Sequence, residues 1–345
     1  MAPDRRGIAY ALASAALFGL SAPLVKILLG DISPWLLAGL LYLGSGSGLA
    51  VARLFLPRDE AKLQRRDLPW LGAAILAGGV IGPVLLMFGL ARGAAGQASL
   101  LLNLESVFTL GIAWTVFREN VDRRLMVGAV AIVAGAVILS WPGQIGAADL
   151  SSALLIAGAC LAWAIDNNLT RQVSAADPTT IAMLKGLIAG AVNTAIAFAA
   201  GAQLPGLGPI AGAALLGFFS YGVSLVAFVV ALRHLGTART GAYYALAPFI
   251  GAAAAILLLA EPVTLPFIAG GLLMALGLYL HLTEQHQHAH VHEPLEHAHA
   301  HIHDEHHHHA HPPGTAPEPH SHVHRHTRLM HKHPHYPDLH HRHEH

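Results

Sequence analysis

The sequence predicts an all-α integral membrane protein with about ten transmembrane helices, built as two inverted five-helix repeats and followed by a disordered C-terminal tail. Three observations predict this fold class. Hydrophobic residues make up 54% of the 345 residues and charged residues only 12%, with a mean hydropathy of +0.51, which is far from the composition of a soluble domain. Long apolar stretches follow one another along the chain, and several of them recur in a second copy.

Ten apolar stretches are each about long enough to cross the hydrocarbon core of a bilayer, which takes roughly 20 residues per helix. They lie at about 8–29, 32–53, 69–91, 94–117, 125–141, 151–170, 179–201, 210–232, 238–260 and 264–281. The first stretch contains "ALASAALFGLSAP", whose small residues also suit a signal-peptide cleavage site. Because this segment recurs later in the chain, we interpret it as the first membrane span.

The positions of Lys and Arg predict the orientation of these spans. They gather at alternate ends of the apolar stretches, at Arg5, Arg6, Arg53, Arg58, Lys62, Arg65, Arg66, Arg118, Arg123, Arg124, Arg171, Arg233 and Arg239. The opposite loops, such as "SWPGQIGAADLSS" and "GAQLPGLGP", carry almost no positive charge. The positive-inside rule therefore predicts an inner-membrane protein with a cytoplasmic N-terminus. An even number of spans places the C-terminal tail in the cytoplasm too.

The two copies are visible as repeated sequence, and they divide the chain into 1–142, 150–282 and the tail 283–345. The stretch "GAAILAGGVIGPVLLMFGLA" overlies "GAALLGFFSYGVSLVAFVVA" at an offset of 140 residues, and Glu119 overlies Glu261 at an offset of 142. Five helices per copy is an odd number, so the second copy inserts upside down relative to the first. Inverted repeats are typical of alternating-access transporters, whose site lies near the midplane between the halves.

Three segments carry a family resemblance: "FGLSAPLVK" in the first stretch, "NLESVFTLGIAWTVFREN" in the fourth, and the weaker echo "YALAPFIGAAAAILLLAEP" in the ninth. The chain from about residue 7 to 282 resembles the EamA family of the drug/metabolite transporter superfamily. This resemblance implies a ten-helix secondary transporter with a central cavity, and usually the export of amino acids, metabolites or other small organic compounds.

Glu105 is the first candidate for a substrate-binding residue. It lies about halfway along the fourth stretch, roughly 16 Å from either end at 1.5 Å per residue. A charged side chain at this depth tends to face a cavity or a partner. Glu105 is thus a candidate for proton coupling or for binding a cationic group, and the alternative is a protonated Glu that locks two helices together. Asn103 lies about 200° away around the helix, so only one of the two is expected to face the pore.

Asp166 and Asn167 form a second polar cluster with Asn168, in the sixth stretch, and they are further candidates for binding substrate. Three consecutive polar residues cover most of a helix face, so they predict either a locally opened helix or a position near the interface. Tyr221 and Tyr243 are candidates to line the substrate site with rings and hydroxyls, although packing or interfacial tyrosines are the alternative.

Basic residues near the membrane give candidates for gating or interfacial roles. Lys26 and Arg171 occupy matched positions in the two repeats, and snorkelling to the interface explains both. Lys185 lies several residues inside the seventh stretch. Glu119 and Glu261 fall in short turns ahead of the next helix, where we expect them to cap exposed N–H groups.

Of the 26 histidines, 25 lie from His281 onward, and 24 of these are in the tail. The tail has almost no apolar side chains, so we expect it to be disordered. Imidazole binds Zn, Ni, Cu and Co well. The predicted ligands for divalent transition metals are His297, His299, His301, His303, His306, His307, His308, His309 and His311. Because free histidine titrates near pH 6.5, a pH sensor that binds anionic lipid is an alternative role for the tail.

Two functional classes follow. The first is a secondary exporter of a small organic metabolite with a metal- or pH-responsive tail, and the second is a divalent metal (Ni, Co or Zn) transporter whose tail collects ions. We expect no enzymatic activity, no required cofactor and no nucleic-acid partner, because the spans hold no catalytic constellation and the formal net charge is zero.

Overall fold

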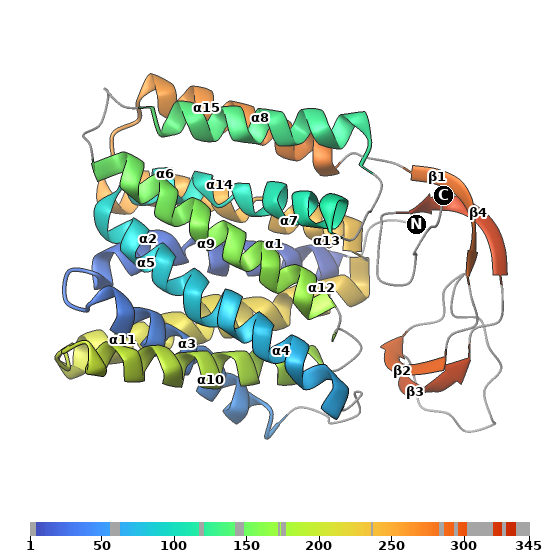
Figure 1. The fold of residues 1–345 in the computed structure, drawn as a ribbon, viewed down its shortest axis with the longest axis horizontal. Coiled ribbons are helices and arrows are strands. Elements are labelled where there is room, and N and C mark those ends of the chain that lie inside the picture. The colour runs from blue at the N-terminus through green and yellow to red at the C-terminus, as the bar shows by residue number, and fades with distance from the viewer. Residues whose placement is uncertain are drawn as a thin grey trace.

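The computed structural model describes residues 5–55, 63–116, 121–141, 148–171, 173, 177–235, 237–282, 286–292, 296–301, 320–325 and 329–335. Up to Leu282 the described residues form helices and short turns (Figure 1). The first repeat contains α1 (Arg5–Gly19), α2 (Ser21–Leu28), α3 (Pro34–Ala52), η1 (Arg65–Asp67), α4 (Leu68–Ala74), η2 (Ile75–Ile81), α5 (Gly82–Arg92), α6 (Ala95–Leu101), α7 (Leu104–Thr115) and α8 (Arg123–Leu139).

The second repeat contains α9 (Ala148–Arg171), α10 (Pro178–Ala199), α11 (Leu207–Gly217), η3 (Phe218–Val223), α12 (Ser224–Leu235), α13 (Thr237–Tyr244), α14 (Ala247–Leu259) and α15 (Leu265–Leu282). The elements of each repeat join into five spans. Spans 1 to 5 are α1–α2, α3, η1–α5, α6–α7 and α8, and spans 6 to 10 are α9, α10, α11–α12, α13–α14 and α15.

Nine of these spans are at least 18 residues long and apolar enough to cross a membrane, among the residues that the structure describes. Span 5 is the helix α8, which has 17 residues and so reaches the lower end of the roughly 17–25 residues that a spanning helix needs. It also packs along α15, which is span 10. The described chain therefore has the ten-span plan that the sequence predicts.

Contacts between the spans repeat when the two halves are exchanged. Span 3 packs on span 6 through α5 and α9, and span 1 packs on span 8 through α1 and α12. Matched spans also pack on each other: α3 on α10, α8 on α15, and α6 on α14. Irregularities recur as well, because spans 3 and 8 both contain a π-helical segment, and spans 4 and 9 are both interrupted near their middle. This pattern is that of two related units facing each other.

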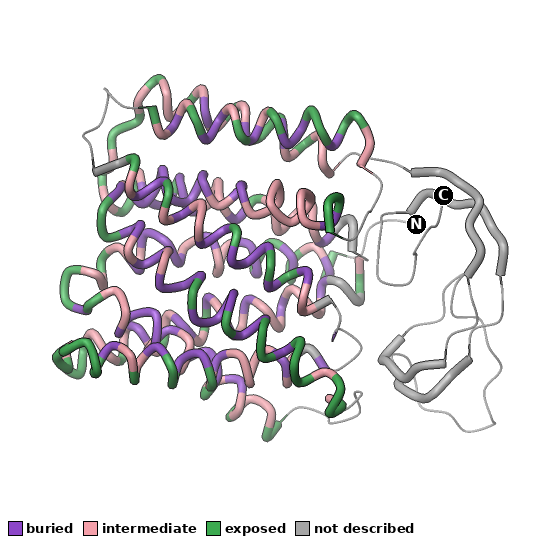
Figure 2. The backbone as a smooth tube through the Cα atoms, viewed as in Figure 1, coloured by how far each residue is buried: buried purple, intermediate pink, exposed green. Residues whose placement is uncertain are grey.

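Close packing of the halves depends on glycine where α3 crosses α10. A Cβ atom added to Gly186 would lie 2.7 Å from the Cα of Gly46, and one added to Gly190 would lie 2.6 Å from the backbone nitrogen of Leu43. Small residues let helix backbones approach in this way inside a membrane. Buried residues concentrate on the helix faces that point into the bundle (Figure 2).

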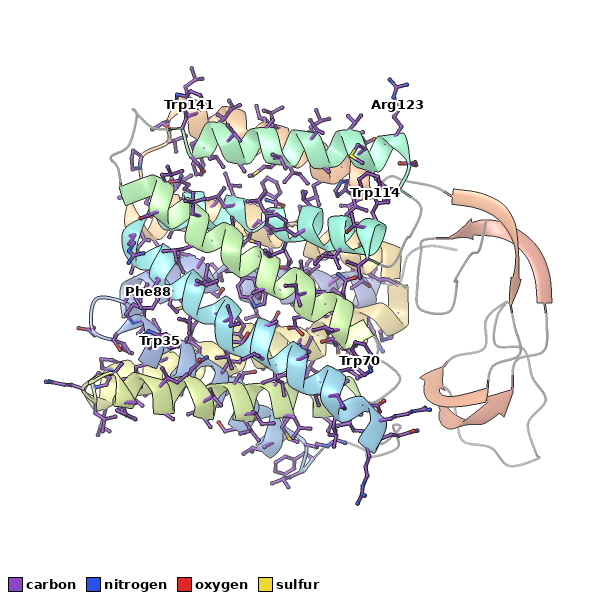
Figure 3. The ribbon with its side chains drawn as sticks, viewed as in Figure 1. Trp35, Trp70, Phe88, Trp114, Arg123 and Trp141 are labelled. Carbon is purple, nitrogen blue, oxygen red and sulfur yellow. The ribbon has the colours of Figure 1, made fainter. Side chains whose placement is uncertain are left out.

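Tryptophans mark both ends of the bundle. We call the end where α1 begins the N-terminal face, and the opposite end the far face. Trp70 and Trp114 lie toward the N-terminal face, whereas Trp35 and Trp141 lie toward the far face (Figure 3). Amphipathic indole rings favour membrane interfaces, so their positions agree with helix axes that run across the bilayer.

Among the described residues of the tail, four short strands pair as two antiparallel sheets. Strand β1 (His286–His292) pairs with β4 (Leu329–His335), and β2 (Glu296–His301) pairs with β3 (His320–Arg325). Two-stranded ribbons are marginally stable in water without a core to pack on. These strands add backbone pairing to a segment for which the sequence predicts no packed core.

Candidate functional site

Span 4 is interrupted near its middle, at the point where the sequence predicts a continuous helix. The helix α6 ends at Leu101 and α7 begins at Leu104. The Asn103 side chain donates a hydrogen bond to the Leu100 carbonyl at 2.8 Å, and the buried Cys160 thiol donates to the Leu101 carbonyl at 3.7 Å. Carbonyls that the break releases are thus satisfied inside the protein, as membrane burial requires.

Glu105 lies in the first turn of α7, directly after this break. Its Oε1 atom accepts a hydrogen bond of 2.7 Å from the Asn167 side-chain amide of α9. Glu105 is half-buried and Asn167 is exposed, whereas Asn103 is 5% exposed and points toward Met274. Asn103 and Glu105 therefore point in different directions, and only Glu105 meets the polar cluster of span 6.

The π-helical segment η2 supplies a second set of polar groups. A π turn leaves backbone carbonyls without their usual α-helical partners. Tyr42 and Trp163 both donate to the Gly78 carbonyl at 2.9 Å, and Asn193 donates to the Gly79 carbonyl at 3.1 Å. Side chains from α3, α9 and α10 therefore converge on one irregular turn of span 3.

Asp166 forms an ion pair beside this turn. The Lys185 ammonium lies 2.5 Å from one carboxylate oxygen and 2.7 Å from the other, and the Thr170 hydroxyl donates to the carboxylate at 2.8 Å. The Asp166 carboxylate packs directly against Gly78, with no room for a Cβ atom there. Asp166 and Asn167 thus have separate roles: Asp166 joins spans 3, 6 and 7, whereas Asn167 contacts Glu105.

Aromatic rings pack around the same region. Tyr221 lies 5.9 Å from Tyr42 and 5.9 Å from Phe18, and Phe18 lies 5.6 Å from Tyr244, between ring centroids. Tyr42 and Tyr244 are both within electrostatic range of Glu105. The rings come from spans 1, 2, 8 and 9, so both repeats contribute. We call Phe18, Tyr42, Tyr221 and Tyr244 the aromatic cluster.

At the far face, residues of both repeats hold the turn between α5 and α6. Lys26 donates hydrogen bonds to the carbonyls of Leu90 (2.5 Å) and Gly93 (2.9 Å) at the end of α5. Glu261 accepts hydrogen bonds from the N–H groups of Ala95 (2.7 Å) and Gly96 (2.8 Å) at the start of α6. Glu261 therefore caps a helix of the other repeat and not its own helix α15. We call Lys26 and Glu261 the far-face clamp.

The N-terminal face has an ion pair of its own, between Arg53 after α3 and Asp177 before α10. Burial on its own would raise the pKa of Asp177. Hydrogen bonds from the Thr180 hydroxyl and the Thr179 N–H, together with the Arg53 guanidinium, outweigh burial and lower this pKa below its usual value.

Some residues singled out in the sequence lie outside this geometry. Tyr243 is half-buried, but its neighbour Tyr244 is the one that joins the aromatic cluster. Arg171 ends α9, and its side chain lies outside the described residues. Outside the described residues lie Glu119, His303, His306, His307, His308, His309 and His311, and of His297, His299 and His301 the structure describes only the backbone of β2.

Sequence reasoning did not single out Tyr42, Trp163 or Asn193, although they bind the carbonyls of η2. Periodicity could not have found them, because a π turn leaves no signature in an apolar stretch. Their signal was weaker: each is a hydrogen-bonding side chain in an apolar run, which needs a partner in lipid.

Together these residues form a polar and aromatic region between the repeats. It offers a carboxylate, an amide and phenol hydroxyls for hydrogen bonds, and ring faces for apolar or cationic groups. Among the residues that the structure describes, no three His, Cys, Asp or Glu side chains are grouped so as to hold a metal ion.

Comparisons with known proteins identify the family. The model of the EamA-like transporter family matches residues 5–141 and again residues 150–283. An uncharacterized transporter of Methanothermobacter thermautotrophicus is 29% identical over 282 residues, which cover 76% of this chain and 82% of that protein. A probable amino-acid metabolite efflux pump of Salmonella typhimurium is 26% identical over 202 residues, covering 54% of this chain and 67% of the pump.

Shorter and structural relatives agree with this assignment. A probable 4-amino-4-deoxy-L-arabinose-phosphoundecaprenol flippase subunit of Pseudomonas fluorescens is 31% identical over 105 residues, covering 30% of this chain and 91% of the subunit, which is about one repeat. A solved crystal structure superposes with a TM-score of 0.59 at 16% identity, covering 79% of this chain and 95% of its own, and so shares the fold. With both repeats matched by the family model, this chain belongs to the EamA-like transporter family.

Proposed function

We propose that this transporter is a secondary exporter of a small organic metabolite or drug-like solute, which it moves by alternating access. One observation carries the proposal: the Glu105 carboxylate and the Asn167 amide meet at a helix break between the two repeats, beside the aromatic cluster. Substrate sites of inverted-repeat transporters lie at such interrupted helices near the membrane midplane.

The exposure of this pair supports a binding role over a locking role. Glu105 is half-buried and Asn167 is exposed, although both lie within membrane spans. A carboxylate is costly in hydrocarbon, so its exposed surface is best explained by water or solute. A solute with an amino or hydroxyl group would donate to Glu105, and its apolar part would pack on the rings.

Differences between the two faces of the bundle support a direction of transport. The far-face clamp holds the α5–α6 turn, whereas Asn167 is exposed and lies near the C-terminal end of α9. Charge distribution predicts that the N-terminal face is cytoplasmic. We therefore propose that the solute enters from the cytoplasm and leaves after the clamp releases.

The solute class that we propose is an amino acid or a related amine. This choice rests on the acidic character of Glu105 and on the similarity to a probable amino-acid metabolite efflux pump. Glu105 is also the residue that we propose for proton coupling, since a carboxyl group between two states can bind a proton in one of them.

The test measures amino acids released by cells that produce the intact chain, Glu105→Gln or Asp31→Asn at equal membrane levels. Asp31 is an exposed acid in the turn between α2 and α3, so its variant is a matched change of acid to amide. We expect the intact chain and Asp31→Asn to raise the external level of one class of amino acids, and Glu105→Gln to lower the initial rate at least about tenfold. Equal export by Glu105→Gln would refute the binding role.

A divalent metal transporter is the second candidate function, and the histidine-rich tail is the observation that favours it. In this alternative the tail collects Ni, Co or Zn at the cytoplasmic mouth. The test is the cellular content of these metals and Cu in cells producing the intact chain, a chain ending at Leu282, or Glu105→Gln. If the intact chain changes the cellular content of one metal and Glu105→Gln does not, the metal is the transported substrate. An effect of the tail alone would make the tail a metal buffer or sensor.

A further inference from the structure

A cavity of about 480 Å³ lies at the far face, apart from the region around Glu105. It opens where α6, α8, α14 and α15 meet, and its walls include Ile138, Trp141, Ile256, Pro266 and Phe267. Figure 3 shows Trp141 at the end of α8 on this face. Its volume is in the range of about 300–1,000 Å³ that small-molecule sites occupy.

Gln97 gives this cavity an unused hydrogen-bond acceptor. Its side chain is 5% exposed and lines the cavity. The Nε2 atom donates to the Leu139 carbonyl at 2.7 Å, which fixes which end of the amide is the oxygen. The Oε1 atom is buried and accepts no hydrogen bond from the described residues. A buried acceptor without a donor is destabilising, and a ligand that donates a hydrogen bond to it removes part of that cost.

Among the described residues, the cavity is lined by one charged residue, the acid Glu261. Its two carboxylate oxygens each accept one backbone N–H from α6. A carboxylate has about four acceptor positions, so two remain. Lys26 lies in electrostatic range of Glu261, but its ammonium is directed to the carbonyls of Leu90 and Gly93 and does not line the cavity.

From this combination we propose that the far-face cavity binds a primary amine with an apolar body. The ammonium donates to Gln97 Oε1 and to Glu261, and the apolar body packs on Trp141 and Phe267. This site shares Glu261 with the far-face clamp, but it lies apart from the solute site proposed around Glu105. The ammonium could be that of an amino-lipid headgroup or of a free amine, because both present the same chemistry.

Binding of tritiated tryptamine to the purified full chain in phosphatidylcholine nanodiscs tests the proposal. We expect saturable binding that weakens about tenfold in Gln97→Leu, which removes a hydrogen bond to a charged group. Gln203→Leu is the matched control, because Gln203 is an exposed glutamine in the turn before α11 and does not line the cavity. We expect indole-3-acetate, which replaces the amine by a carboxylate, not to compete.

A second variant tests the cavity without removing the hydrogen bond that Gln97 donates to Leu139. Gln97→Leu also removes the donor to Leu139, whereas Ala94→Phe fills the cavity from its rim and leaves Gln97 in place. We expect Ala94→Phe to abolish tryptamine binding. Competition by phosphatidylethanolamine nanodiscs would identify the lipid headgroup as the ligand, and no competition would identify a free amine; either result supports the amine site. Absence of saturable binding, or equal binding by both variants and the intact chain, would overturn the proposal.

Discussion

Replacing Glu261 by Gln tests whether one repeat holds a helix of the other. In the structure the two carboxylate oxygens accept the N–H groups of Ala95 and Gly96 at 2.7 and 2.8 Å. Glutamine keeps one acceptor oxygen and loses the charge. The loss is one hydrogen bond to a charged group, about 1.5–3 kcal/mol, and the charge–dipole interaction, about 0.3–1 kcal/mol. Because Glu261 is half-buried, we take the lower end, about 2 kcal/mol.

This free energy is measurable as hydrogen exchange at the start of α6. At about 1.4 kcal/mol per factor of ten, the local opening equilibrium of the α6 amides shifts roughly 30-fold. Hydrogen–deuterium exchange of the peptide containing residues 94–101 reports this shift when exchange follows the opening equilibrium.

A matched substitution at another helix cap distinguishes a local effect on α6 from a general loss of stability. Asp122 caps its own helix α8 by accepting the Leu125 N–H at 2.7 Å. We expect Asp122→Asn to change exchange at the start of α8 and to leave α6 unchanged. Exchange of α6 in Glu261→Gln that equals the intact chain would refute the reasoning, since the cap would then contribute nothing to the stability of α6.

Three further predictions concern Gly78, Lys185 and Asp177. Gly78→Ala forces a Cβ atom into Asp166, and we expect a loss of about 1–3 kcal/mol in thermal unfolding, whereas Gly72→Ala, which has open space around its Cβ, should unfold like the intact chain. Lys185→Met leaves Asp166 buried without its cation, and we expect a loss of about 3–5 kcal/mol that adding Asp166→Asn partly restores. Asp177 has a lowered pKa in the folded protein. Its stabilising contribution is therefore present above about pH 4 and is lost as the pH falls through the lowered pKa. We expect the melting temperatures of the intact chain and Asp177→Asn to differ at about pH 7 and to converge below about pH 4.

The ten spans and the two repeats follow from the sequence, because apolar length and repeated residues determine them. The interruption of span 4 does not follow. Leu101 and Leu102 are good helix formers, and the break is stabilised by Cys160 and Asn103, whose contacts depend on how the spans pack. The π-helical segment η2 is hidden for the same reason: its pattern of apolar residues fits an α-helix equally well.

For the polar residues too, the sequence predicts some contacts and leaves others open. Depth along the helix predicts that Glu105 faces a cavity or a partner, and in the structure its carboxylate accepts a hydrogen bond from Asn167. Sequence spacing could not show that Asp166 meets Lys185, because the pair joins different helices. Lys185 was a candidate for a gating or interfacial role, and in the structure the Asp166 carboxylate holds its ammonium inside the bundle. Glu261 was expected to cap a helix, and the structure shows that this helix belongs to the other repeat.

The cap by Glu261 has a consequence for the order of events during synthesis. Ala95 emerges from the ribosome 166 residues before its acceptor, which at about 5–20 residues per second is a delay of roughly 10–30 s. During that time the first five spans are complete, but the α6 N–H groups have no partner from the second repeat. The first half of the chain therefore waits in the membrane in an unfinished form, and the arrival of the α14–α15 turn completes it.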